Sequence, residues 1–127
     1  MSHFTTIKTR MVEKAFLLKA LADLGHAPQD GNVEVRGYLG IRTIVEVKIA
    51  TQNPDYDIGF HKIGENYQCV ADWFGLREMD QTKFIEQITQ RYSYHAARAK
   101  LEEQGFALTS EETQKDGRIH LVLRRMT

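Results

Sequence analysis

The chain has 127 residues, of which 42% are hydrophobic and 27% are charged. This length and composition are typical of one globular domain, so we expect residues 1–127 to form a single α+β unit. The 17 basic and 17 acidic residues give a formal net charge of zero. That balance does not favour nucleic acid as a partner, because nucleic-acid binding draws most of its affinity from basic surfaces.

Cysteine content and hydropathy bear on the compartment. The single cysteine, Cys69, cannot form an internal disulfide, which is typical of a reducing compartment. No apolar run approaches the roughly 18 residues of a membrane span, and Met1–Lys8 has no apolar signal core. We therefore expect a soluble cytoplasmic protein without membrane insertion.

The first predicted elements are a strand and a helix. Alternating and β-branched residues predict a short strand at Ser2–Lys8. Thr9 is a candidate N-cap for a helix over Arg10–Leu24, and Gly25 is a typical stop signal.

The middle of the chain predicts a meander of strands. Gly37 and Gly40 indicate a bend or bulge between the first two strands. The links are short, so consecutive strands should be antiparallel neighbours. The predicted strands are Asn32–Gly37, Arg42–Ala50, Tyr56–Ile63 and Tyr67–Asp72.

A long helix and a hairpin complete the chain. Asp80 is the expected N-cap of a helix over Gln81–Gln104, which Gly105 ends. The last two strands, Phe106–Glu111 and Arg118–Arg124, form the predicted hairpin. The element order predicts an α+β fold, in which an antiparallel sheet of five to seven strands carries two helices packed on one face. The residues expected to be nearly fully buried are Leu17, Leu21, Val45, Val47, Ile88, Leu121 and Leu123.

One face of the long helix carries a histidine within an apolar stripe. His95 lies near the middle of that stripe, beside Tyr92, and Arg91 and Arg98 flank it. In one interpretation His95 is a general base or ligand and the arginines attract an anion. In the other, the ring is buried and hydrogen-bonded within the chain. We favour the second, because no second titratable partner can be placed beside it.

Two further groups allow two interpretations each. Tyr94, Ala97 and Leu101 form a second stripe, which either the chain's own hairpin or a partner protein covers. Trp73 and Phe74 lie in a predicted loop, either as anchors of a binding surface or folded over the sheet edge as core. For the Trp-Phe pair we favour the core interpretation.

Motifs for catalysis and for metal or cofactor binding are missing from the sequence. Cys69 with His61, or His120 with His95, are the pairs considered for a metal, but neither has the spacing of a zinc site. No nucleophile elbow, phosphate loop or dinucleotide fingerprint occurs. We therefore expect no catalytic residue, no metal and no cofactor.

Three segments together resemble one known family. Met1–Thr9, Leu21–His26 and Gln90–His95 are similar to the hypothetical chloroplast reading frame thirty-five family of cyanobacteria and algal plastids, and the resemblance covers the whole chain. It implies a cytoplasmic or stromal protein of a photosynthetic lineage without an established activity. It supplies no catalytic residues.

These observations predict a non-enzymatic binding or assembly factor that recognises a protein partner and can also self-associate. The candidate binding residues are Arg91, Tyr92, Tyr94, His95, Arg98, Leu101, Trp73 and Phe74. The alternative is a small enzyme or ligand-binding domain with a pocket between the long helix and the sheet. A cavity that reaches His95 would favour this alternative, and a sealed core would favour the binding factor.

Overall fold

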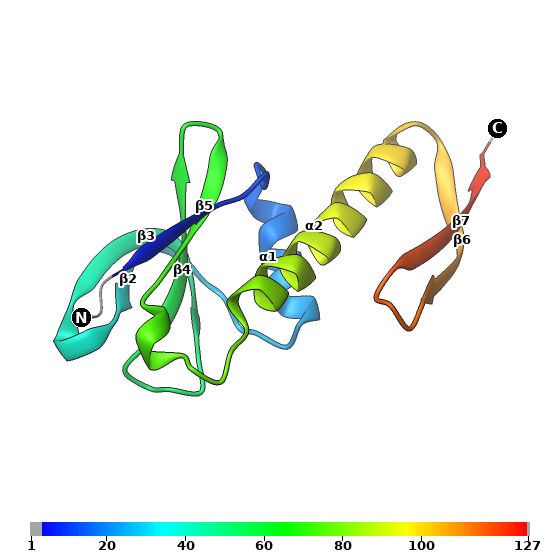
Figure 1. Cartoon of the computed structure of the whole chain (residues 1–127). Coiled ribbons are helices and arrows are strands. Elements are labelled where there is room, and N and C mark those ends of the chain that lie inside the picture. Colours follow the sequence, from blue (N-terminus) through cyan, green and yellow to red (C-terminus); the bar gives the residue numbers. More distant parts are fainter. Residues whose placement is uncertain (1–3, 127) are drawn as a thin grey trace.

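The computed structural model describes residues 4–126 (Figure 1). The predicted start of the first strand at Ser2 lies outside these residues. The strands are β1 (Thr5–Lys8), β2 (Gln29–Arg36), β3 (Arg42–Ala50), β4 (Asp57–Ile63), β5 (Asn66–Ala71), β6 (Phe106–Thr113) and β7 (Ile119–Arg125). The helices are α1 (Lys14–Asp23) and α2 (Gln81–Glu103), and the short 3₁₀ turns are η1 (Tyr38–Gly40) and η2 (Trp73–Gly75).

Five strands form one antiparallel sheet in the order β1-β5-β4-β3-β2. The register places Phe60 of β4 opposite Val47 of β3 and Cys69 of β5. Within residues 4–126, β6 and β7 pair only with each other, as a separate hairpin beyond α2 (Figure 1). The predicted α+β class is therefore confirmed, with five strands in the sheet.

Both helices cover the same face of this sheet, as predicted (Figure 1). Alternation along β3, β4 and β5 directs every second side chain toward them. The core formed there is fully or almost fully buried, and its central side chains are Leu17, Ala20, Leu21, Val47, Ile49, Ile58, Phe60, Cys69, Phe84 and Ile88. Within residues 4–126, no helix is both long and apolar enough to cross a membrane.

The opposite face of the sheet is closed in part by the β2–β3 hairpin. Val35 and Val45 of this hairpin form a second buried cluster with Val70 of β5. Gly59 of β4 lies beneath them, and a Cβ there would lie 2.4 Å from Val35 and 2.8 Å from Val45. A residue without a side chain is thus needed for the hairpin to approach the sheet this closely.

The start of α1 differs from the prediction. The helix begins at Lys14 and not at Arg10, and Thr9 does not cap it. The Thr9 hydroxyl instead donates to the carbonyl of Tyr67 and accepts from the Met11 N–H. These bonds hold residues 9–11 against β5, so the helix cannot start there.

The prediction of a buried core is confirmed for Leu17, Leu21, Val45, Val47 and Ile88. It is wrong for two residues of the hairpin, Leu121 and Leu123, which are only half-buried. The hairpin packs on the outer side of α2 and not on the sheet, so only one element covers its apolar side.

We expect Ile88→Ala to lower the free energy of unfolding by about 2–5 kcal/mol, because Ile88 is fully buried between α2 and the sheet. Ile44→Ala is the matched control, since Ile44 is 61% exposed and its truncation should change stability by about 0.5 kcal/mol or less. Urea unfolding measures both. Equal effects of the two substitutions would contradict the assigned core.

Candidate functional site

The histidine on α2 bonds to a carboxylate of α1. His95 is 16% exposed, and its Nε2 lies 2.6 Å from Oδ2 of Asp23, the last residue of α1. Arg91 donates to the same oxygen from Nε at 2.9 Å. Partial burial raises the pKa of Asp23, but the bonds from His95 and Arg91 outweigh this and hold the pKa below its ordinary value. The cluster thus joins the two helices by a shared carboxylate.

Tyr92 has a role at the start of α1. Its hydroxyl oxygen accepts the backbone N–H groups of Val12 and Glu13, both at 2.9 Å. Its ring packs edge-on against Phe16 of α1, with centroids 5.9 Å apart. The Glu13 side chain makes no cap bond, so Tyr92 satisfies donors at this helix end from a position about 80 residues away.

The chain's own hairpin covers the second stripe of α2 in part, because Tyr94 is buried and Leu101 half-buried, whereas Ala97 is exposed. Tyr94 is buried, and its hydroxyl donates to the Glu111 carboxylate of β6 at 2.9 Å. Arg98 donates to the same hydroxyl and to Glu102. Leu101 is half-buried beside them. The Tyr94–Glu111 bond therefore joins the hairpin to α2, and Arg98 orients the Tyr94 hydroxyl from within the same helix.

Trp73 and Phe74 have different environments in η2. Trp73 packs on the core, edge-on to Phe84, with ring centroids 6.1 Å apart. Its Nε1–H is buried and has no hydrogen-bond partner within residues 4–126. Phe74 is 47% exposed, and the Arg77 guanidinium lies over its ring at 4.9 Å. Of the eight sequence-predicted binding residues, Phe74 is the apolar one that remains largely open to solvent.

Phe74 is part of a larger apolar surface. Its ring packs edge-on against Tyr38, with centroids 5.5 Å apart, although the two residues are 36 positions apart in the sequence. Leu39 and Ile41 continue this surface around the tip of the β2–β3 hairpin. We call these exposed residues, Tyr38, Leu39, Ile41 and Phe74, the contact surface.

Leu39 is the most exposed of them, at 85%. Its backbone has φ 52° and ψ 33°, the left-handed conformation that bulky side chains rarely adopt. Gly40 follows with φ 76°, and the Ile41 N–H donates to the Tyr38 carbonyl at 3.2 Å. This is the geometry of a type I′ turn, whose first central position favours Asn, Asp or Gly. The leucine is thus locally disfavoured and also exposed to solvent.

Buried Asp72 connects the two parts of the contact surface. One carboxylate oxygen accepts the Tyr38 N–H at 3.0 Å, and the other accepts the Phe74 N–H at 3.2 Å. Gly37 allows this approach, because a Cβ there would lie 2.9 Å from the Cβ of Asp72. One carboxylate therefore fixes the hairpin tip relative to η2.

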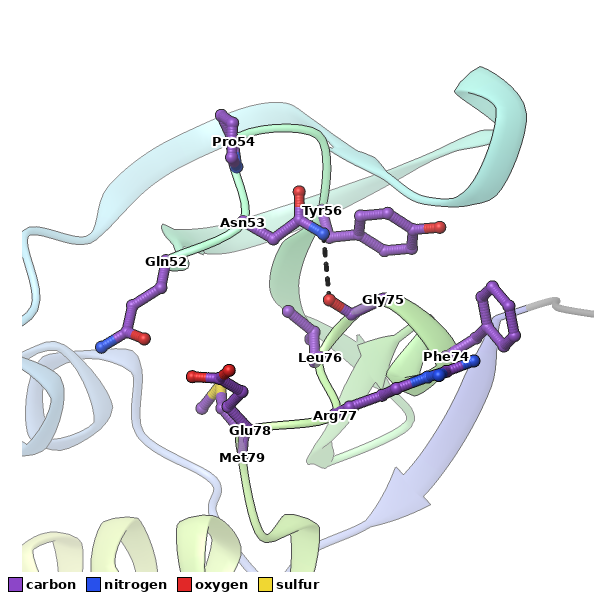
Figure 2. A pocket seen from close by; sticks show the side chains of 10 residues that line it. All are labelled: Gln52, Asn53, Pro54, Tyr56, Phe74, Gly75, Leu76, Arg77, Glu78 and Met79. Atoms are coloured by element: carbon purple, nitrogen blue, oxygen red, sulfur yellow. Dashed lines mark hydrogen bonds between the residues drawn. The ribbon is translucent and has the colours of Figure 1, made fainter.

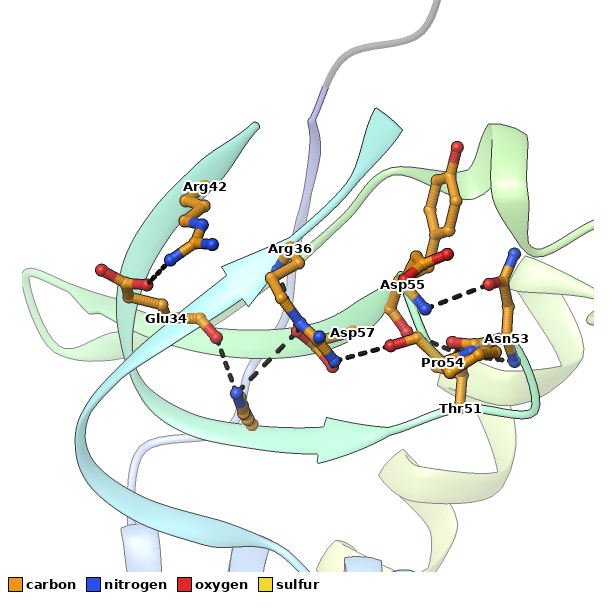
Figure 3. A network of polar contacts seen from close by, with 10 residues as sticks. Glu34, Arg36, Arg42, Thr51, Asn53, Pro54, Asp55 and Asp57 are labelled. Carbon is orange, nitrogen blue, oxygen red and sulfur yellow. Dashed lines mark hydrogen bonds and ion pairs between the residues drawn. The ribbon is translucent and has the colours of Figure 1, made fainter. Parts of the chain in front are cut away.

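A second buried carboxylate, Asp57, bonds to Arg36 at the end of β2, just before the hairpin tip (Figure 3). It accepts the Arg36 backbone N–H and Nε at 2.9 Å each and Nη2 at 3.1 Å. Burial raises the pKa of Asp57, but the bonds from Arg36 and the nearby Lys48 outweigh it and lower the pKa from 3.8. Arg36 also donates to the Pro54 carbonyl, which links the hairpin to the β3–β4 loop.

A groove lies next to Phe74, between the β3–β4 loop and the link from η2 to α2 (Figure 2). It has a volume of about 640 Å³, and a smaller cavity of about 290 Å³ shares Gln52, Glu78 and Met79 with it. Tyr56 and Leu76 supply apolar lining, and the Asn53 side chain donates to the Gly75 carbonyl across it. His95 lines neither cavity.

Cys69 and His61, one of the two pairs considered for a metal and not favoured, do not come together. Cys69 faces the helices, and His61 lies on the opposite side of β4, bonded to Glu46 at 2.8 Å. Burial raises the pKa of the Cys69 thiol to about 12, which removes its thiolate at neutral pH. No group of three or more His, Cys, Asp or Glu side chains within residues 4–126 is placed to hold a metal ion.

The contact surface escaped the sequence analysis because its residues meet only in three dimensions. Tyr38, Leu39 and Ile41 come from a turn, and their proximity to Phe74 depends on how the hairpin folds across the sheet. One signal was available, since a leucine before Gly40 in a predicted bend is an unusual choice of turn residue.

The fold and this surface define a small α+β protein with an exposed apolar turn held by buried carboxylates. The chain belongs to the ycf35 family: the family described as "Protein of unknown function (DUF1257)" matches residues 20–122. It is 34% identical to "Uncharacterized protein ycf35" of Cyanophora paradoxa and 35% identical to that of Guillardia theta, each over 98% of both chains. The protein of the same description in Pyropia yezoensis is 31% identical. No solved structure matches the chain.

For His95 we expect Gln to be tolerated better than Leu, because only Gln can still donate to the Asp23 carboxylate. The Leu variant leaves that carboxylate with fewer partners and should lose about 1–3 kcal/mol of stability. Thermal melts of both variants beside wild type measure the difference. A Leu variant as stable as the Gln variant would contradict the structural role.

Asp57→Asn should reduce the dependence of stability on acid pH. The pKa of Asp57 is lowered in the folded state, so its contribution is complete above the ordinary value of about 3.8 and is lost as the pH falls toward the folded pKa. Urea unfolding at pH 7 and at a series of pH values below 3.8 should therefore show the two proteins converging as the pH falls. A constant difference would refute the assignment.

Proposed function

We propose that the protein is a non-enzymatic assembly or accessory factor that binds protein through the contact surface. The observation that carries this proposal is the conformation and exposure of Leu39. The side chain is 85% exposed on a left-handed backbone, at a position where Asn or Gly is locally better. A residue that favours neither solubility nor the turn is readily explained by burial against a partner.

The way the surface is held supports the same proposal. Asp72 fixes the backbone on both sides of the Tyr38–Phe74 contact. Arg36 and Asp57 fix the base of the hairpin. Association then requires little ordering of the surface, which favours affinity. Aromatic side chains such as Tyr38 and Phe74 are typical of the core of protein interfaces.

The alternative of a small enzyme or ligand-binding domain with a pocket near His95 has less support. His95, Arg91 and Tyr92 use their polar groups or rings to join α1 and α2. The two cavities are lined by other residues. We accordingly assign these side chains to the fold. We place the protein in the cytoplasm, or in the stroma where the gene is plastid-borne, without membrane insertion or nucleic-acid binding.

Photo-crosslinking in the native cell tests this function. A benzoylphenylalanine in place of Phe74 should give discrete crosslinked protein adducts, because that position is 47% exposed within the contact surface. Val122 is the matched control position, at 46% exposure on the remote hairpin. Adducts that Leu39→Asn abolishes are the expected result. Equal adducts from both positions, or none from position 74, would refute the proposal.

A further inference from the structure

We draw no further inference here: the strongest candidate, the groove between the β3–β4 loop and the link from η2 to α2, is lined side by side by the opposite charges of exposed Arg77 and Glu78, so its chemistry selects no one class of ligand and nothing in the structure shows what occupies it.

Discussion

The position of the contact surface depends on one constraint, the close approach of the β2–β3 hairpin to Gly59 of β4. The helices cover one face of the sheet, and the other face is closed in part by the chain itself. Val35 and Val45 can lie over β4 only because Gly59 has no side chain. Once the hairpin crosses the sheet, Arg36 reaches Asp57 and the tip reaches Asp72. The position of the exposed apolar turn thus follows from the packing of a buried valine cluster.

Hydrophobic periodicity predicted the helices and strands well, but it predicted less well how deeply their apolar faces are buried. Alternation along β3 and the helical stripes of α1 and α2 identified the α+β class and five of the seven core residues correctly. Alternation along the last strand did not indicate that Leu121 and Leu123 would face α2 alone. A pattern shows which side of a strand is apolar, but the depth of burial depends on how many elements cover that side. Long-range bonds caused the other miss, since Tyr92 and Tyr67 determine where α1 begins.

The candidate site shows a similar division. Sequence reasoning singled out the polar groups on α2 and favoured a bond within the chain for His95. Its reason was wrong, because the structure does place a titratable partner beside the ring, the Asp23 carboxylate of α1. Phe74 was a candidate binding residue, but its surroundings depend on Tyr38, which is 36 positions away. A surface assembled from a turn and a 3₁₀ segment has no periodicity, so no window of sequence reveals it. Turn chemistry is the remaining signal, because it makes Leu39 a local exception.

The buried carboxylates Asp57 and Asp72 affect how readily the exposed Leu39 can bind a partner, because they fix the loop that carries it. Burying Asp57 and Asp72 is unfavourable unless every oxygen has a partner, and the structure supplies backbone N–H groups for both. These bonds fix the direction in which the hairpin tip points, which neutral packing alone would leave less defined. If an exposed leucine lay on a mobile loop, the conformational entropy lost on binding would offset most of the free energy gained by burying its side chain. Here Asp57 and Asp72 already fix the loop, so its conformational entropy is lost during folding. A partner can therefore bind the apolar surface with little further loss of entropy.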